Sequence, residues 1–212
     1  MKRARRVVWA VAAWALGATA EARPVHHQGF YTRLALGAGY LSSTETTSFG
    51  DVSVTGGGLA LQVALGGYVA PGLALHGTLR GTVALDPAVR FGTTTAVVTN
   101  GSLQSSAVGV GVTYTFVPVD FYLSASLGVG VLRVERALSG SFSSVRVEAQ
   151  TELGLALDFG LGKQWAVSDD WALGVSGMLF YQRNSERASS SSSATFPIDS
   201  LGVAVLFSAT YH

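Results

Sequence analysis

Seven polar or ionisable side chains stand at alternating positions within otherwise apolar segments: Arg33, Gln62, His76, Arg80, Glu152, Asp158 and Gln182. Burial of such groups is unfavourable unless they are paired and hydrogen bonded. Two bases, two acids and one histidine on one face therefore predict a hydrogen-bonded ladder. We expect Arg80 to pair with Glu152, and Arg33 to pair with Asp158. Such a ladder would act as a polar plug, and a gated narrow pore or proton path is the functional alternative.

Catalytic chemistry has few residues to draw on in this chain. There is no cysteine, which excludes thiolate chemistry, disulfides and Cys-based metal sites. The four histidines are His26, His27, His76 and His212, and none is expected beside a serine on an outer strand face. Asp169-Asp170 is expected to lie in a turn. The sequence predicts no catalytic residues, no metal site and no cofactor.

Arginine gathers at the ends of two expected loops. Arg133, Arg136 and Arg146 flank one loop, and Arg183 and Arg187 flank another. Because the guanidinium group binds phosphate through two parallel hydrogen bonds, these residues predict contact with anionic lipid, in particular with lipopolysaccharide phosphates. Ordinary solvated loop bases are the alternative interpretation.

Eight segments that alternate large apolar residues with Gly, Ala, Ser or Thr must position these side chains. A period of two is typical of β-strands. A soluble strand would cover its second face with charge, and here that face is too small and too uncharged to meet water. We therefore expect Leu and Val to face acyl chains and the small residues to fill a narrow interior. The expected strands are 30–41, 58–69, 73–84, 104–117, 121–133, 149–162, 171–183 and 198–211.

The connections between these segments alternate in length. Turns are expected at 69–72, 117–120 and 163–170, and long Ser/Thr/Gly-rich loops at 42–57, 85–103, 134–148 and 184–197. This alternation predicts an all-β fold, a transmembrane up-and-down antiparallel β-barrel of eight strands, with short periplasmic turns and long extracellular loops. An aromatic girdle is expected at the periplasmic ends, formed by Phe30, Tyr68, Phe116, Phe121, Trp165, Trp171 and Tyr211.

The N-terminus is predicted to be a secretory signal peptide covering residues 1–22. Four basic residues precede a short apolar stretch, and small residues follow it. Residues 23–29 would form a periplasmic segment, and 30–212 the barrel. Without the leader, the chain contains ten Lys and Arg residues and twelve Asp and Glu residues. It therefore lacks the excess of positive charge that is typical of nucleic-acid-binding proteins. The mean hydropathy is +0.37, yet no apolar run is long enough for a membrane helix.

With these features the chain resembles the small eight-stranded outer-membrane barrels of the OmpA/OmpX-like superfamily. The resemblance covers about 30–212 and includes the alternating final segment 201–212, which ends in Tyr211-His212. It implies outer-membrane lipids and lipopolysaccharide as surroundings, and a barrel-assembly machinery that reads the last strand during insertion. His212 after the aromatic residue departs from the family pattern. We expect no C-terminal peptidoglycan-binding domain.

These observations predict an integral protein of a Gram-negative-type outer membrane, porin-like in architecture and without enzymatic activity. Its role would be structural or would lie in surface interaction through the extracellular loops. Three alternatives stay open: a narrow channel for small solutes, a lipid-modifying barrel enzyme, and a secreted soluble barrel that binds an apolar ligand.

Overall fold

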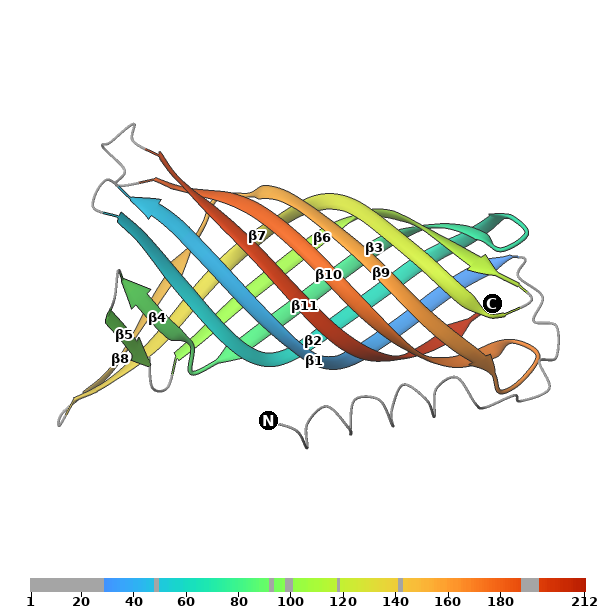
Figure 1. Cartoon of the computed structure of the whole chain (residues 1–212), viewed down its shortest axis with the longest axis horizontal. Helices are drawn as coiled ribbons and strands as arrows, with labels where there is room; N and C mark the ends of the chain where they lie inside the picture. Colours follow the sequence, from blue (N-terminus) through green and yellow to red (C-terminus); the bar gives the residue numbers. More distant parts are fainter. Residues whose placement is uncertain are drawn as a thin grey trace, which may run out of the picture.

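The computed structural model describes residues 29–47, 50–91, 94–97, 101–117, 119–140, 143–187 and 195–212, and these form one closed antiparallel barrel (Figure 1). Its wall consists of β1, β2, β3, β6, β7, β9, β10 and β11, each paired with its neighbours, and β1 closes the wall by pairing with both β11 and β2. The predicted eight-stranded barrel is confirmed. The bounds of these strands are Phe30–Thr47, Gly50–Ala70, Leu73–Leu85, Gly101–Phe116, Phe121–Gly140, Gly154–Ala166, Trp171–Arg187 and Thr195–Tyr211.

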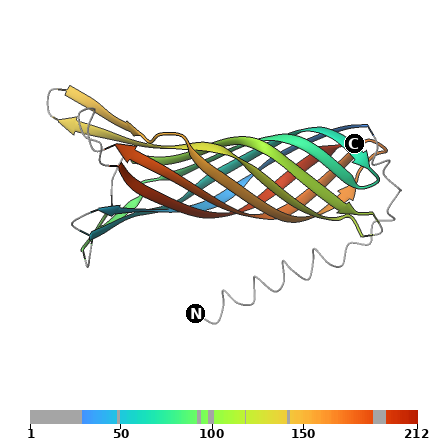
Figure 2. The ribbon, with the colours of Figure 1, turned by 90° about the horizontal axis from the view of Figure 1, so that it is seen from above.

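Three shorter strands stand at one end of the barrel. β4 (Ala88–Phe91) and β5 (Thr94–Val97) form a hairpin that pairs with β2, and β8 (Ser143–Gln150) pairs with the far part of β7. Figure 2 shows these hairpins extending beyond the tube at the end opposite the short turns. The expected signal peptide and residues 23–28 lie outside the described residues.

The wall is apolar on its outer face and carries small and polar residues on its inner face, which is the reverse of a soluble barrel. Leu, Val and Phe side chains point outward along every wall strand, and Val110 and Phe207 are each 70% exposed. Alternate residues such as Ala60, Ala64 and Ala204 are buried inside. Exposure of so much apolar surface to water would be strongly unfavourable, so the wall suits hydrocarbon. Within the part of the chain that the structure describes, no helix has the length and apolar character of a membrane span.

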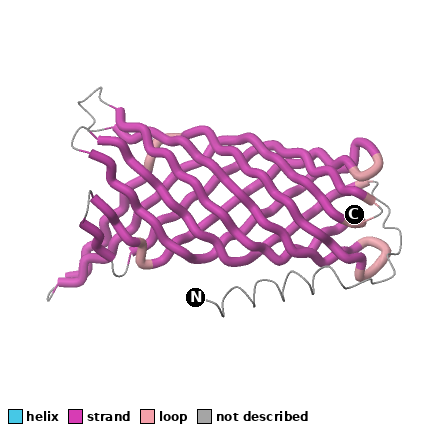
Figure 3. The backbone as a smooth tube through the Cα atoms, in the orientation of Figure 1, coloured by secondary structure: helices cyan, strands magenta, loops and turns pink. Residues whose placement is uncertain are grey.

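The strands are longer than the sequence pattern predicts. β1 and β2 stay paired from Phe30↔Gly67 to Thr47↔Gly50, across the region expected to be a loop at 42–57. The expected loops 85–103, 134–148 and 184–197 likewise contain strand, as the nearly continuous tube of strand in Figure 3 shows. The prediction was wrong because it followed apolar alternation, which stops where a strand leaves the lipid. Backbone pairing continues there, supported by Ser, Thr and Val.

The sixth wall strand is displaced from its predicted position. It was expected at 149–162, but β9 covers Gly154–Ala166, so Lys163 belongs to the strand and only 167–170 form the turn. Residues 151–153 have no strand geometry and bridge both neighbours: the Thr151 N–H donates to the Leu132 carbonyl and the Glu152 N–H to the Ser185 carbonyl, each at 3.0 Å. The turn at Pro71-Gly72 lies where the sequence predicts it, and Val117, Val119 and Asp120 have turn geometry in the second predicted turn.

Most of the expected girdle residues point outward near the short turns. Phe30, Phe116 and Trp171 are exposed, and Trp171 packs edge-on against Tyr211 with ring centroids 5.3 Å apart. Phe121 and Trp165 are partly exposed on the outer face beside Lys163.

Tyr68 departs from this girdle, and its prediction as a member was wrong. Its ring contacts two inward-facing rings, those of Tyr31 at 5.6 Å and of His212 at 5.8 Å. Tyr68 shares the inward parity of Gln62 and Ala64 on β2. The prediction was based on the nearness of Tyr68 to a strand end. Whether a side chain points inward or outward depends instead on its odd or even position in the strand, because successive side chains point to opposite faces.

Inward glycines allow the strands to approach closely. A Cβ at Gly37 would overlap the carbonyl oxygen of Val205, and one at Gly128 would overlap that of Val108. Both obstacles are backbone atoms of neighbouring strands, so a side chain could be accommodated only by moving the wall. These glycines therefore set the bend that closes a narrow barrel.

We expect Gly128→Ala to lower the free energy of unfolding by about 2 kcal/mol, because the new methyl group overpacks a rigid wall. Gly81→Ala is the matched control, since its Cβ would meet no atom within 4 Å. Urea titration in lipid vesicles, followed by the heat-modifiable gel shift, measures both. Equal midpoints for the two variants would contradict this account.

Candidate functional site: the polar network in the lumen

Arg80 lies at the centre of the lumen. It projects inward from β3 and is only 1% exposed. Its Nε donates to Asp158 Oδ1 on β9 at 2.8 Å, its Nη1 to Ser105 Oγ on β6 at 3.0 Å, and its Nη2 to Gln182 Oε1 on β10 at 3.1 Å. The guanidinium carbon also lies 4.1 Å from the centroid of the Phe180 ring. One cation thus joins three other strands across the barrel.

The partners of Arg80 are held by further hydrogen bonds. Asp158 Oδ2 accepts from Ser126 Oγ on β7 at 2.8 Å, and Gln182 Nε2 donates to Asn184 Oδ1 at 2.8 Å. The Asn184 amide in turn donates to the backbone carbonyls of Gly130 and Glu152, each at 2.8 Å. Because each of these buried groups has a partner, the charge of Arg80 is compensated and this layer is well ordered.

The structure brings Arg80, Asp158 and Gln182 together in the lumen, but the pairs differ from the expected ones. Arg80 pairs with Asp158, and Arg33 does not: its Nη2 donates to Gln62 Oε1 at 3.3 Å, and its Nε and Nη1 have no partner among the described atoms. Gln62 is the cross-strand neighbour of Arg80, so it links the two levels of the lumen. The predicted pairs were wrong because the position of each residue along the barrel axis was estimated from its place in its own strand. The stagger between neighbouring strands was not taken into account.

Glu152 does not belong to the lumen. It is exposed in the irregular stretch 151–153, and its side chain lies 3.5 Å from Ser185 Oγ. We expected Glu152 to lie in a regular strand, where its side chain would point to the same inner face as that of Asp158. The strand is interrupted before Gly154, so the alternation of inward and outward side chains does not extend to Glu152.

The lumen on the two sides of the Arg80 layer has different character. Toward the hairpin end it is filled by apolar side chains, among them Leu41, Leu103, Leu132 and Ile198. Toward the short turns it is aromatic and polar. His76 Nε2 lies 2.9 Å from Thr113 Oγ1, the Tyr68 hydroxyl lies 2.5 Å from His212 Nδ1, and Arg33 lies over the Tyr122 ring at 4.7 Å.

The central ion pair is buried in the lumen. Arg80 is 1% exposed and Asp158 5%, and their neighbours Gln182 and Phe180 are fully buried. The His76–Thr113 pair is also buried. Among the described residues there is no group of three or more His, Asp or Glu that could hold a metal ion.

The expected phosphate-binding arginines lie toward the hairpin end. Arg133 donates to Gln150 at 2.9 Å on the outer surface, and Arg183 lies 3.8 Å from Asp199 and is largely exposed. The side chains of Arg136, Arg146 and Arg187 lie outside the described residues. The two described arginines project from β7 and β10, which both flank β9.

Sequence reasoning missed several members of the network, notably Ser105, Ser126, Asn184 and Phe180. Each has the inward parity of its strand, and that signal was available. Serine was treated as a small filler, and Asn184 lay one residue beyond the predicted end of its strand. Phe180 was missed because an aromatic ring was not expected in so narrow an interior.

No family model matches the sequence, and no curated protein is significantly similar to it. Similar solved structures include Neisserial surface protein A (NspA), with 12% identity over 86% of this chain and 96% of that chain and a TM-score of 0.48. Another is OprG from Pseudomonas aeruginosa, with 11% identity, coverages of 88% and 98% and a TM-score of 0.47. A third is the outer membrane protease OmpT from Escherichia coli, with 8% identity, coverages of 90% and 99% and a TM-score of 0.44.

Likeness at this level carries no functional information, so the assignment of the fold rests on the closed wall, its apolar exterior and its polar interior. This is a small eight-stranded β-barrel of the outer-membrane type. A closed barrel with a lipid-facing wall and aromatic residues at one rim belongs in the outer membrane of a Gram-negative-type envelope.

We expect Asp158→Ala to lower the free energy of unfolding by about 3 kcal/mol, because it leaves the Arg80 charge buried without its counterion. The double variant Arg80→Met/Asp158→Leu should recover most of this loss. Arg183→Ala is the control, and loss of its exposed pair should cost less than about 1 kcal/mol. Urea titration in vesicles measures all three. A loss for Asp158→Ala no larger than for Arg183→Ala would refute the central role of the pair.

Proposed function

We propose that this barrel is non-enzymatic and serves envelope integrity or surface interaction through the hairpins at its extracellular end. One observation carries the proposal: a buried, hydrogen-bonded polar layer crosses the middle of the lumen, whereas in the described part of the chain paired strands extend beyond the barrel at the end opposite the short turns. Function on a rigid scaffold usually lies in such connecting segments.

The partners follow from the same geometry. The outer wall would contact outer-membrane lipids, and Arg133 and Arg183 would lie near the phosphates of lipopolysaccharide. β11, which alternates apolar and inward residues and closes the barrel against β1, would be the strand read by the barrel-assembly machinery. The proposal includes no cofactor and no nucleic acid.

The orientation of the barrel is testable by tag insertion. An epitope tag between Arg187 and Thr195 should be accessible to antibody and protease on intact cells, because this connection joins β10 to β11 at the end opposite the short turns. A tag between Ser168 and Asp169, in the turn at the opposite end, should become accessible only after the outer membrane is permeabilised. Protection of the first tag with exposure of the second would reverse the orientation and remove the surface role.

The role in envelope integrity is tested in the same cells. Deletion of the gene should raise sensitivity to detergent, and the wild-type gene should restore resistance. A variant that lacks the β4–β5 hairpin should separate the two roles: it should keep detergent resistance and lose any surface adhesion. Unchanged detergent sensitivity and unchanged adhesion after deletion of the gene would contradict the proposal.

A narrow channel is the main rival, and the buried Arg80 layer is our reason for favouring a closed lumen. We expect the wild-type barrel to give no single-channel steps in planar bilayers, because the buried side chains of Arg80 and Phe180 lie packed together in the middle of the lumen. The double truncation Arg80→Ala/Phe180→Ala should give small steps if the variant inserts. Steps of equal size from both proteins would show that this layer does not close the lumen.

A further inference from the structure

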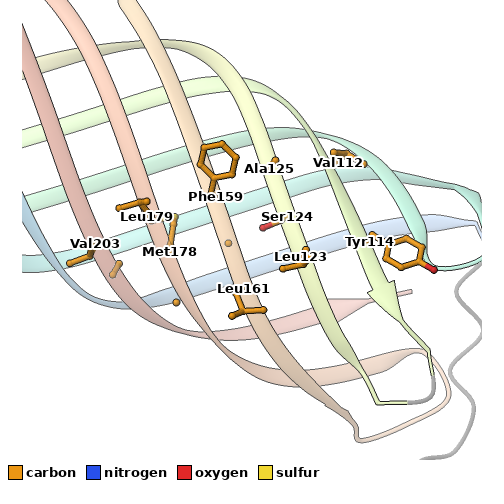
Figure 4. Close-up of a pocket in the computed structure, with 13 residues that line it drawn as sticks. Val112, Tyr114, Leu123, Ser124, Ala125, Phe159, Leu161, Met178, Leu179 and Val203 are labelled. Carbon is orange, nitrogen blue, oxygen red and sulfur yellow. The ribbon is translucent and has the colours of Figure 1, made fainter. Parts of the chain in front are cut away.

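The lipid-facing wall is not uniform, because it contains a trough near the short-turn end (Figure 4). The trough is a hollow of about 700 Å³ across β6, β7, β9, β10 and β11. Its sides are outward apolar side chains: Val112, Leu123, Phe159, Leu161, Leu179 and Val203. Figure 4 shows these side chains following one another from Tyr114, beside the short turns, to Val203, farther along the barrel.

The trough arises from small residues at outward positions. Ala125 and Gly177 stand where other outward positions carry Leu or Val, and Ala125 lies between Val112 and Phe159 in the cross-strand register. A Cβ at Gly177 would meet no atom within 4 Å, so neighbouring side chains do not fill the space. A second hollow of about 760 Å³ shares Val112, Ala125 and Phe159 and continues the trough toward Gly77 on β3.

A cationic group stands at the end of this apolar trough. Lys163 lies two residues beyond Leu161 on β9, on the same outer face, and its cross-strand neighbour is Phe121. The Lys163 ammonium lies 5.2 Å from the Phe121 ring centroid and 5.9 Å from that of Trp165. Lysine and aromatic residues in this position lie at the level of lipid headgroups.

We propose that this wall is a binding site for one anionic phospholipid of the periplasmic leaflet. The phosphate group would contact the Lys163 ammonium between Phe121 and Trp165, and one acyl chain would lie in the trough over Ala125 and Gly177. Charge complementarity with a phosphate, together with an apolar trough that begins beside the cation, favours a lipid over a second copy of the chain. The proposal depends on the membrane orientation of the barrel and not on its surface role.

The first test is the lipid that stays with the protein. Wild-type barrel extracted from outer membranes in mild detergent should retain one phospholipid, detected by native mass spectrometry and by lipid extraction. Gly177→Leu should lose it, because the new side chain fills the trough. Gly81→Leu is the matched control: it also places a leucine on the outer face where a Cβ meets no atom within 4 Å, and it lies outside the trough. This control should retain the lipid.

The second test concerns the headgroup. Delipidated protein is titrated with phosphatidylglycerol or phosphatidylcholine in micelles, and bound lipid is counted by native mass spectrometry. Lys163→Gln should weaken phosphatidylglycerol binding about fivefold, the effect expected of one basic residue at an anionic surface. Phosphatidylcholine binding should change little. The folded state of each variant is checked by its heat-modifiable gel shift.

Two outcomes would overturn the proposal. Equal lipid retention by wild type, Gly177→Leu and Gly81→Leu would show that the trough holds no particular lipid. A lipid-free wild-type dimer that Gly177→Leu alone converts to monomer would assign the trough to a second copy of the chain.

Discussion

The absence of water inside a bilayer is the constraint on which this structure depends. Hydrocarbon offers no hydrogen-bond partner, so each backbone N–H and C=O in the span must find one within the protein. A sheet can meet that demand only if its first and last strands join, and β1 pairs with β11 from Thr32↔Tyr211 to Glu45↔Ile198. The apolar exterior, the small inward residues and the polar centre are all consequences of this closure.

Closure with eight strands leaves an interior that side chains alone can fill. The protein fills it in layers, with aliphatic residues toward the hairpins, the Arg80–Asp158 layer in the middle, and tyrosine, histidine and Arg33 toward the short turns. Charge is tolerated at the centre because it is fully paired. Long inward side chains such as Gln182 and Phe180 find room because the residues beside them, Gly130 and Gly202, have no side chain.

The sequence predicted the fold well because the apolar alternation reports directly which solvent each face meets. It predicted strand ends poorly, since Ser- and Thr-rich strands beyond the membrane keep their pairing and lose that pattern. It identified Arg80, Asp158 and Gln182 as inward residues, but it could not pair them, because pairing depends on the stagger between strands. Tyr68 was misplaced because the alternation of inward and outward residues on its strand was overlooked. Glu152 was misplaced because this alternation is interrupted at 151–153.

The hydrogen bonds of Arg80 across the lumen join some strands of the wall and leave others without such a link. They tie β3 to β6, β9 and β10, and Ser126 adds β7 through Asp158. Among the described side chains, β11 and β1 contribute no charged partner to this layer, and the Ser43–Ser200 hydrogen bond of 2.8 Å joins these two strands to each other. Under a pulling force we therefore expect the seam of β11 and β1 to separate before the buried Arg80–Asp158 pair breaks, and the strands that Arg80 joins to separate last.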